Sequence, residues 1–273
     1  MKLEKMDGID VSLRDGALTV TINRPERRNA CTPDQMNHIG QVCVAAESDD
    51  DVRVVVIRGT GDAFCAGADL SDADLTASGG QIPPISMGRN LFLPILELSK
   101  PLIGVMNGVA AGGGLGLALC CDIRIAAERA RFATSFTRIG ITANDAVAYL
   151  LPRTVGVAKA LELIYFATPI DATEAERIGL VSYVKPDDQL DGFVDEFVGR
   201  ILAGPPAGLR FSKRLVIDGL DRTYREHVLA QEYASLANRA VADHDIQEGV
   251  AAFKEKRPPR FRGILVKPRW KNY

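Results

Sequence analysis

Two glycine-rich stretches decide the fold of this chain: Phe64-Cys65-Ala66-Gly67-Ala68-Asp69-Leu70 and Gly112-Gly113-Gly114-Leu115-Gly116. Each follows an apolar run that is typical of a buried strand. Glycine leaves the backbone N–H groups at such a strand end open to close approach. Two N–H groups that point at one oxygen atom form an oxyanion hole, in which one donor lowers a reaction barrier by roughly 3 kcal/mol. The two stretches therefore predict a backbone site for developing negative charge.

The composition excludes several classes of protein. The chain has 273 residues, of which 47% are hydrophobic and 25% charged, and its formal net charge is −2. This length suits one large domain, or one domain with a helical appendage. The near-neutral charge argues against nucleic acid as a partner, and glycines interrupt the apolar run at residues 104–121, so we expect no membrane insertion. The five cysteines lack metal-ligand spacing, which predicts buried thiols, a cytoplasmic location and no metal site.

Strand and helix signals alternate through the N-terminal part of the chain. A helix is predicted to begin at Thr32, with Pro33 in its first turn and Gln35 completing a capping box. Alternating strands and helices imply right-handed crossovers and a parallel sheet, so the predicted class is α/β. The other predicted elements are strands at residues 17–23, 52–58, 101–106 and 123–127 and helices at residues 89–98 and 115–119.

After Pro169 the pattern becomes mainly helical. We predict a short helix at residues 173–178, an apolar segment at 180–184, and helices from 189 onward with breaks at 204–206 and 243–245. The chain is therefore divided into an α/β core, residues 1–200, and a helical C-terminal region, residues 201–273. Residues 71–84 combine Gly, Ser, Asp and Pro, which predicts a mobile loop beside the first glycine-rich stretch.

Several of these motifs, taken together, resemble the enoyl-CoA hydratase/isomerase (crotonase) superfamily. The resemblance runs from about residue 10 to residue 262 and rests on four stretches in the right order: residues 23–30, 61–70, 107–122 and 253–257. It implies a spiral of ββα units with a C-terminal helical region that forms trimers or hexamers. It also implies a coenzyme A thioester as substrate, with no separate cofactor.

The resemblance assigns roles to particular residues. It implies that the N–H groups of Ala68 and Gly113 are the oxyanion donors, a role that suits the start of the helix after Gly113. Phe136 and Tyr149 are expected to shape the acyl pocket, although simple packing is favoured for Tyr149. For the charged residues a solvated turn or helix end is an equal alternative to coenzyme A binding. The implied coenzyme A positions are Arg27, Arg28, Ala30, Ala66, Asp69, Leu70, Phe253 and Lys256.

The acid/base positions depart from the family pattern. In hydratases of this family two glutamates hold the attacking water, and the matching positions here are Gly116 and Phe136. Neither side chain transfers a proton, so ordinary addition of water is not expected. Isomerase-like members place their acid four residues after the position of Gly140, which is Asn144 in an alignment without gaps. Asp145 then lies one residue late.

Asp145 has two interpretations of equal weight. A carboxylate on a mostly apolar segment would have a raised pKa and could carry a proton between the α and γ carbons of an acyl chain. Alternatively, Asn144 or Asp145 caps the following helix. The same segment is similar to that of dehalogenase members of the superfamily. Proton-shuttling isomerase chemistry is favoured, with hydrolysis, dehalogenation or non-catalytic acyl-CoA binding as alternatives.

Overall fold

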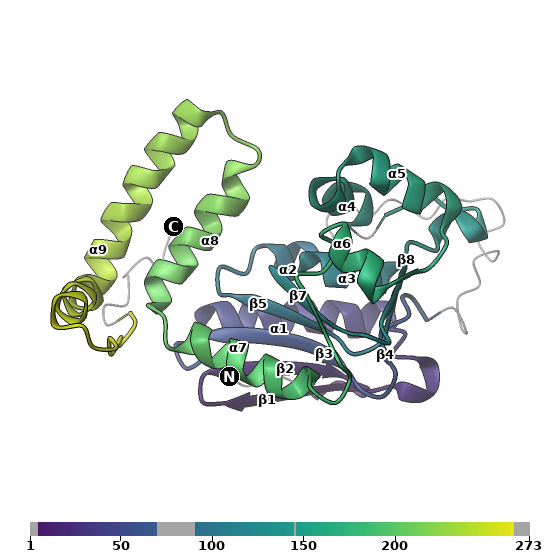
Figure 1. Cartoon of the computed structure of the whole chain (residues 1–273), viewed down its shortest axis with the longest axis horizontal. Coiled ribbons are helices and arrows are strands. Elements are labelled where there is room, and N and C mark those ends of the chain that lie inside the picture. The colour runs from purple at the N-terminus through teal and green to yellow at the C-terminus, as the bar shows by residue number, and fades with distance from the viewer. Residues whose placement is uncertain (1–4, 70–90, 145, 265–273) are drawn as a thin grey trace.

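The computed structural model describes residues 5–69, 91–144 and 146–264, and its centre is a six-stranded sheet (Figure 1). The strand order is β1-β2-β3-β5-β7-β10. Strand β1 runs antiparallel to β2, and the other neighbours are parallel. The bounds are β1 (Ile9–Arg14), β2 (Ala17–Ile22), β3 (Val54–Gly59), β5 (Leu102–Met106), β7 (Ile123–Ala127) and β10 (Tyr183–Lys185). The predicted α/β class and the strands at β2, β3, β5 and β7 are confirmed.

Strand β1 was not predicted. It pairs with β2 through a two-residue turn, Asp15-Gly16, in which both residues have positive φ angles, 50° and 88°. That conformation is the one that suits a tight hairpin. Most of β1 is exposed or half-buried at the sheet edge, so its side chains lack the apolar alternation by which a strand is recognised in sequence.

A second, smaller sheet places the glycine-rich stretches. It has the order β4-β6-β8-β9, with β4, β6 and β8 parallel and β9 antiparallel to β8. Its strands have only two or three residues, too few to show a period in sequence. They are β4 (Ala63–Cys65), β6 (Val109–Ala111), β8 (Arg131–Ala133) and β9 (Ile170–Asp171). Each of β3, β5 and β7 is thus followed by a short strand of the second sheet, which gives the expected spiral of ββα units.

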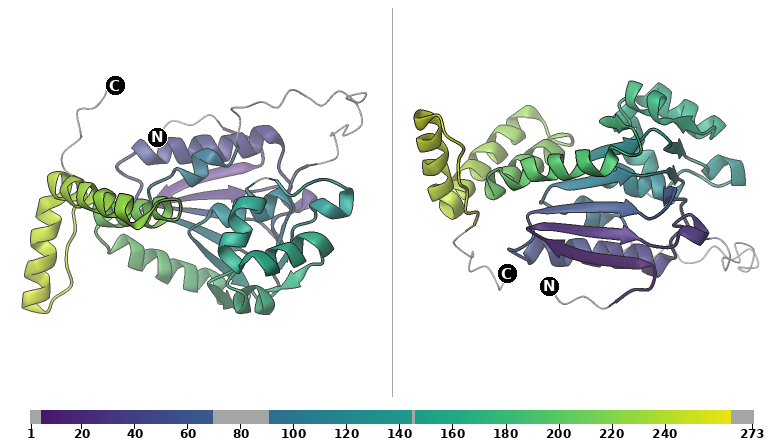
Figure 2. Two further views of the ribbon diagram at one scale, coloured as in Figure 1. Left: turned by 90° about the horizontal axis from the view of Figure 1, so that it is seen from above. Right: turned by 60° about the horizontal axis from the view of Figure 1, so that its bottom comes forward.

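Helices cover both faces of the large sheet (Figure 2, left). Val55 and Ile57 of β3 pack with helix α1 (Pro33–Ser48), whereas Val54 and Val56 pack with α7 (Leu190–Leu202) on the opposite face. The predicted capping box is confirmed at α1. The remaining helices of this part are η1 (Pro25–Arg27), α2 (Leu93–Leu96), α3 (Gly113–Cys120), η2 (Phe136–Ile139), α4 (Val147–Val155), α5 (Val157–Phe166) and α6 (Ala172–Arg177).

The last two helices, α8 (Pro206–Gly219) and α9 (Tyr224–Glu255), pack against each other and stand to one side of the sheets (Figures 1 and 2). The predicted break at 204–206 separates α7 from α8. The break expected at 243–245 is a local departure from helical geometry at Ala242. Helix α7 packs on the large sheet, and the helical pair begins at Pro206.

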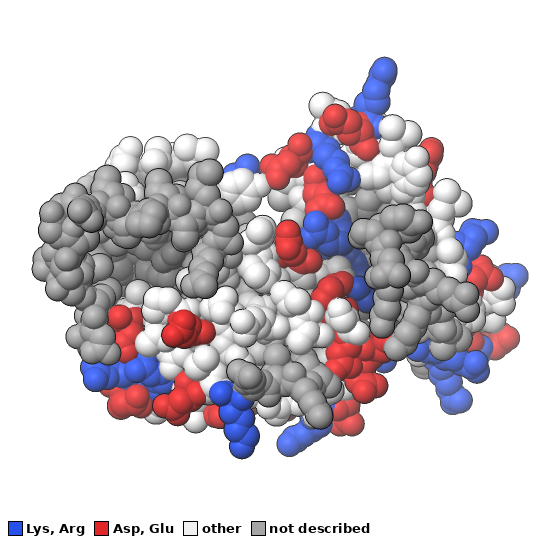
Figure 3. All heavy atoms as spheres, turned by 180° about the vertical axis from the view of Figure 1, so that it is seen from behind, with Lys and Arg blue, Asp and Glu red and all other residues white. Residues whose placement is uncertain are grey.

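Two features of the structure concern possible partners, namely the distribution of surface charge and the length and composition of the helices. Acidic and basic side chains lie interspersed over the face drawn in Figure 3. Among the helices that the structure describes, none has the length and apolar character needed to cross a bilayer.

Candidate functional site

The fold brings the two glycine-rich stretches together. Strands β4 and β6 are parallel neighbours, with Ala63 opposite Val109 and Cys65 opposite Ala110. Their carboxyl ends therefore meet at one edge of the small sheet, and the chain leaves β4 into Gly67 and β6 into Gly112. A Cβ atom placed on Gly67 would lie 3.4 Å from the Gly113 nitrogen. The strand at the first stretch is thus β4, which includes Phe64 and Cys65, and the strand before the second stretch is β6. The longer strands predicted from the sequence lie further upstream.

Glycine is required at two positions of this junction. Gly67 has a φ of 107°, and a Cβ there would lie 2.9 Å from the Ala111 carbonyl oxygen. Gly114 packs so closely on β4 that a Cβ would lie 2.0 Å from the Cys65 carbonyl oxygen. Any side chain at Gly114 would separate the start of α3 from the end of β4. The glycines therefore set the spacing of the two backbones.

The N–H groups of Ala68 and Gly113 are open donors at this junction. The Cys31 N–H donates to the Gly67 oxygen and the Asp69 N–H to the Cys31 oxygen, both at 2.9 Å. Because consecutive N–H groups of an extended segment point to opposite sides, the Ala68 N–H points away from Cys31. Gly113 is the first residue of α3, where N–H groups have no partner within the helix. Among the described residues, neither N–H has a hydrogen-bond acceptor.

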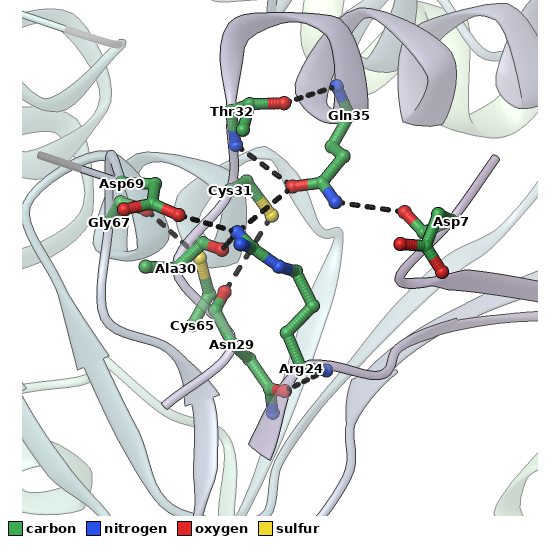
Figure 4. A network of polar contacts seen from close by, with 10 residues as sticks. All are labelled: Asp7, Arg24, Asn29, Ala30, Cys31, Thr32, Gln35, Cys65, Gly67 and Asp69. Atoms are coloured by element: carbon green, nitrogen blue, oxygen red, sulfur yellow. Dashed lines mark hydrogen bonds and ion pairs between the residues drawn. The ribbon is translucent and has the colours of Figure 1, made fainter. Parts of the chain in front are cut away.

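A network of polar contacts holds the first glycine-rich stretch in place (Figure 4). The Arg24 guanidinium contacts the Asp69 carboxylate at 2.8 Å and donates to the Ala30 oxygen at 2.6 Å. Asn29 is fully buried, and its amide donates to the oxygens of Ala63 and Thr60 at 2.7 and 2.8 Å. Neither Asn29 nor Arg24 was predicted as a site residue, although both lie in the stretch of residues 23–30 that carries the family resemblance.

Asn107 performs a similar role beside β6. It is buried, its amide donates to the oxygens of Gly61 and Ala63, both at 3.0 Å, and its side-chain oxygen accepts from the Gly59 N–H at 3.1 Å. These three bonds join the end of β3, the turn after it and β4. A polar residue directly after a buried strand was the only signal for this role in the sequence.

The cysteines are buried free thiols, as predicted. Burial raises the pKa of Cys43 and of Cys121 to about 12. The side-chain hydrogen bond to Cys65 raises the pKa of Cys31 well above its usual range. The raised pKa values keep the Cys31, Cys43 and Cys121 thiols protonated at neutral pH, whereas the side-chain hydrogen bond with Cys31 lowers the pKa of Cys65.

Several predicted coenzyme A positions lie around the first stretch. Arg27 and Arg28 are exposed at η1, next to the segment that pairs with residues 66–69. The Ala66 N–H donates to the Arg28 oxygen at 3.0 Å, whereas Ala30 and Asp69 both contact Arg24. Leu70 and the predicted loop at 71–84 lie outside the described residues.

Two other predicted positions are remote from this junction within one chain. Phe253 is 86% exposed near the end of α9, and Lys256 is the C-cap residue of that helix. Figure 1 shows this end of α9 on the opposite side of the molecule from β4 and α3. The structure does not bring these two residues together with Ala68 and Gly113 in one chain.

The positions of the family's glutamates carry no proton-transfer group. Gly116 is buried within α3, and Phe136 is buried in the hydrophobic core at η2. Asn144 is exposed, and its backbone oxygen accepts from the Val147 N–H at 2.8 Å. The N-cap of α4 is Ala146, without a side-chain cap, so the capping alternative is wrong for Asn144. Asp145 lies outside the described residues.

Tyr149 has its hydroxyl group engaged on the surface. The hydroxyl donates to a carboxylate oxygen of Asp221 at 2.7 Å, and this bond raises the pKa of Tyr149. The Arg153 guanidinium lies 3.7 Å from the centre of the ring. Tyr149 therefore joins α4 to the turn between α8 and α9.

Comparisons with known proteins identify relatives of this chain. The profile of the family described as Enoyl-CoA hydratase/isomerase matches residues 13–264. The chain is 33% identical over 264 residues to the 1,2-epoxyphenylacetyl-CoA isomerase of Escherichia coli (strain K12), covering 94% of this chain and 99% of that protein. It is 36% identical over 241 residues to the crotonyl-CoA hydratase of Syntrophomonas wolfei, covering 88% and 92%. A crystal structure of an enoyl-CoA hydratase from Bacillus anthracis has a TM-score of 0.84 and 30% identity, covering 93% of this chain and 99% of that one.

Proposed function

The chain belongs to the enoyl-CoA hydratase/isomerase family, and we propose that it catalyses proton transfer along the acyl chain of a coenzyme A thioester, in the manner of an isomerase. The Ala68 and Gly113 N–H groups would hold the thioester oxygen. The observation that carries the proposal is that β4 and β6 are parallel neighbours and that, among the described residues, neither of these N–H groups has an acceptor.

The chemistry follows from the charge that develops on the thioester. When the α C–H bond of a 3-enoyl thioester breaks, its electron pair delocalises onto the carbonyl oxygen and gives an enolate. Two N–H donors stabilise that charge, and the N-terminus of α3 adds a favourable dipole. The proton then returns to the γ carbon, and the double bond moves into conjugation with the carbonyl group. Atoms and charge balance without a further reactant.

Isomerisation is favoured over hydration because neither residue at the two glutamate positions can transfer a proton. Gly116 has no side chain, and Phe136 is apolar and buried, so nothing at either position activates water. One of the relatives is named as an isomerase. We assign the proton transfer to Asp145 on sequence grounds, because it lies next to the apolar residues Ala146 and Val147, which favour a raised carboxyl pKa.

We propose that the coenzyme A moiety lies along the loop of residues 27–30, with Arg27 and Arg28 toward its phosphates. Phe253 and Lys256 would reach the nucleotide of a neighbouring subunit in a trimer or hexamer. Support for such an assembly comes from the large apolar residues that α9 exposes, namely Leu229, Tyr233 and Leu236, with exposed fractions of 56%, 73% and 66%. An exposed apolar surface of this kind is typical of subunit contacts.

The test compares two substrates on the same enzyme. We expect turnover of trans-3-hexenoyl-CoA to trans-2-hexenoyl-CoA, with hydration of crotonyl-CoA at least tenfold slower. Asp145→Asn is expected to abolish isomerisation and to retain binding of hexanoyl-CoA, measured by isothermal titration calorimetry. Unchanged turnover in this variant would exclude Asp145 as the proton carrier. Absence of micromolar binding by the wild type would contradict the whole proposal.

A further inference from the structure

The direction of the Ala68 N–H depends on how the segment of residues 28–31 pairs with residues 66–69. Three backbone hydrogen bonds define this pairing: the Ala66 N–H to the Arg28 oxygen, the Cys31 N–H to the Gly67 oxygen, and the Asp69 N–H to the Cys31 oxygen. A slip of one residue would turn the Ala68 N–H toward Cys31. The pairing is short, since its β-type geometry is confined to one bridge between Cys31 and Ala68.

One side-chain nitrogen joins both partners of this pairing. The Arg24 Nη1 atom lies 2.6 Å from the Ala30 oxygen, 2.8 Å from an Asp69 carboxylate oxygen and 3.3 Å from the Gln35 side-chain oxygen (Figure 4). Ala30 and Asp69 each lie one residue away from the bridge. The ion pair is shielded from water, since the Arg24 and Asp69 side chains are 19% and 9% exposed. Electrostatic attraction is stronger in such surroundings than at an open surface.

The position of Arg24 is itself fixed by its surroundings. Its backbone N–H donates to the Asn29 side-chain oxygen at 2.9 Å. Its aliphatic stem lies so close to Gly8 that a Cβ there would be 2.6 Å from the Arg24 Cγ atom. Gln35, the third partner, also accepts from the Thr32 N–H in the capping box of α1. Arg24 therefore connects the first glycine-rich stretch to a rigid helix end.

We propose that Arg24 and Asp69 are positioning residues that hold the Ala68 N–H in line with the thioester oxygen, an inference that rests on the function proposed above. Asp69 then acts through its ion pair with Arg24 and not by contact with coenzyme A. This assignment differs from the one that the sequence resemblance implied for Asp69. It also gives Arg24 a role different from the exposed Arg27 and Arg28 of the same turn.

The test separates positioning from substrate binding. Arg24→Met keeps the aliphatic stem and removes the guanidinium contacts to Ala30, Asp69 and Gln35, which together form the clamp. We expect kcat for trans-3-hexenoyl-CoA isomerisation to fall about 100-fold, as for one misplaced hydrogen-bond donor, and KM to change less than threefold. Asp69→Ala should give the same pattern, and the double variant should lose no more than Arg24→Met alone, because both remove one clamp. Arg58→Met is the matched control, since Arg58 pairs with Asp191 at 2.7 Å on the far side of β3, and its kcat should equal that of the wild type.

A conservative variant distinguishes the clamp from a general loss of structure. The three partners of Arg24 meet at its Nη1 atom, and a lysine side chain also carries three donors on one nitrogen. Arg24→Lys should therefore retain a larger kcat than Arg24→Met at equal thermal stability. An unchanged kcat in Arg24→Met, or a raised KM with unchanged kcat, would overturn the inference. Equal losses in the lysine and methionine variants would also overturn it. A wild type that does not isomerise the probe would instead refute the proposed function, since that result requires no variant.

Discussion

Replacing Gly114 by alanine tests whether the spacing of two backbones produces the activity. The new Cβ would lie 2.0 Å from the Cys65 carbonyl oxygen, whereas ordinary contact begins at 3.4 Å, so α3 and β4 must separate by about 1.4 Å. A displacement of that size takes the Gly113 N–H out of hydrogen-bond range of an oxygen held by Ala68. Loss of one donor raises the barrier by about 3 kcal/mol, which lowers kcat by about 10²–10³-fold.

The effect on stability should be smaller than the effect on rate. Overpacking costs about 1–3 kcal/mol, and alanine in a helix regains about 1 kcal/mol over glycine. Gly199→Ala is the control, because Gly199 lies in α7 with open space around its Cβ position, so kcat should be unchanged and stability should rise slightly. The assays are isomerisation of trans-3-hexenoyl-CoA and urea unfolding. A folded Gly114→Ala enzyme with wild-type kcat would refute the reasoning.

Three further predictions concern the scaffold. Thr32→Ala removes the α1 capping box and should lower the free energy of unfolding by about 1 kcal/mol in urea titrations; an unchanged midpoint would contradict this. Asn107→Asp turns a buried amide donor into a carboxylate that faces the oxygens of Gly61 and Ala63, so the melting temperature should fall at neutral pH and partly recover in acid, where the carboxyl group is protonated. Burial lowers the pKa of Lys100 from 10.5 to about 8, so between these pH values the unfolded chain binds more protons and the Lys100 contribution to stability rises with pH. Parallel pH–stability curves for the wild type and Lys100→Met would exclude that linkage.

Local signals were sufficient for part of the fold. The Thr32–Gln35 capping box and the apolar strands β2, β3, β5 and β7 depend on residues close together in the sequence, and all were predicted. The short strands β4 and β6 depend on pairing between distant segments. Their three residues each show no period, so only the glycines after them marked the place.

The support of the candidate site was not predictable for the same reason. Arg24, Arg27 and Arg28 stand in one charged turn, and nothing nearby in the sequence distinguishes them. Arg24 is half-buried where it meets Asp69, 45 positions further along the chain. The burial of Asn29 likewise arises from β4 and the turn before it. Roles that depend on a tertiary partner have no local signature.

The carbonyl stretching frequency of a bound thioester tests the central claim most directly. Infrared difference spectra of hexanoyl-CoA labelled with ¹³C at the thioester carbon would isolate this vibration on the wild-type protein. Two hydrogen bonds from Ala68 and Gly113 should polarise the C=O bond and lower its frequency relative to the same thioester in water, and Gly114→Ala should reverse much of that shift. A bound carbonyl with the frequency found in water would contradict the account.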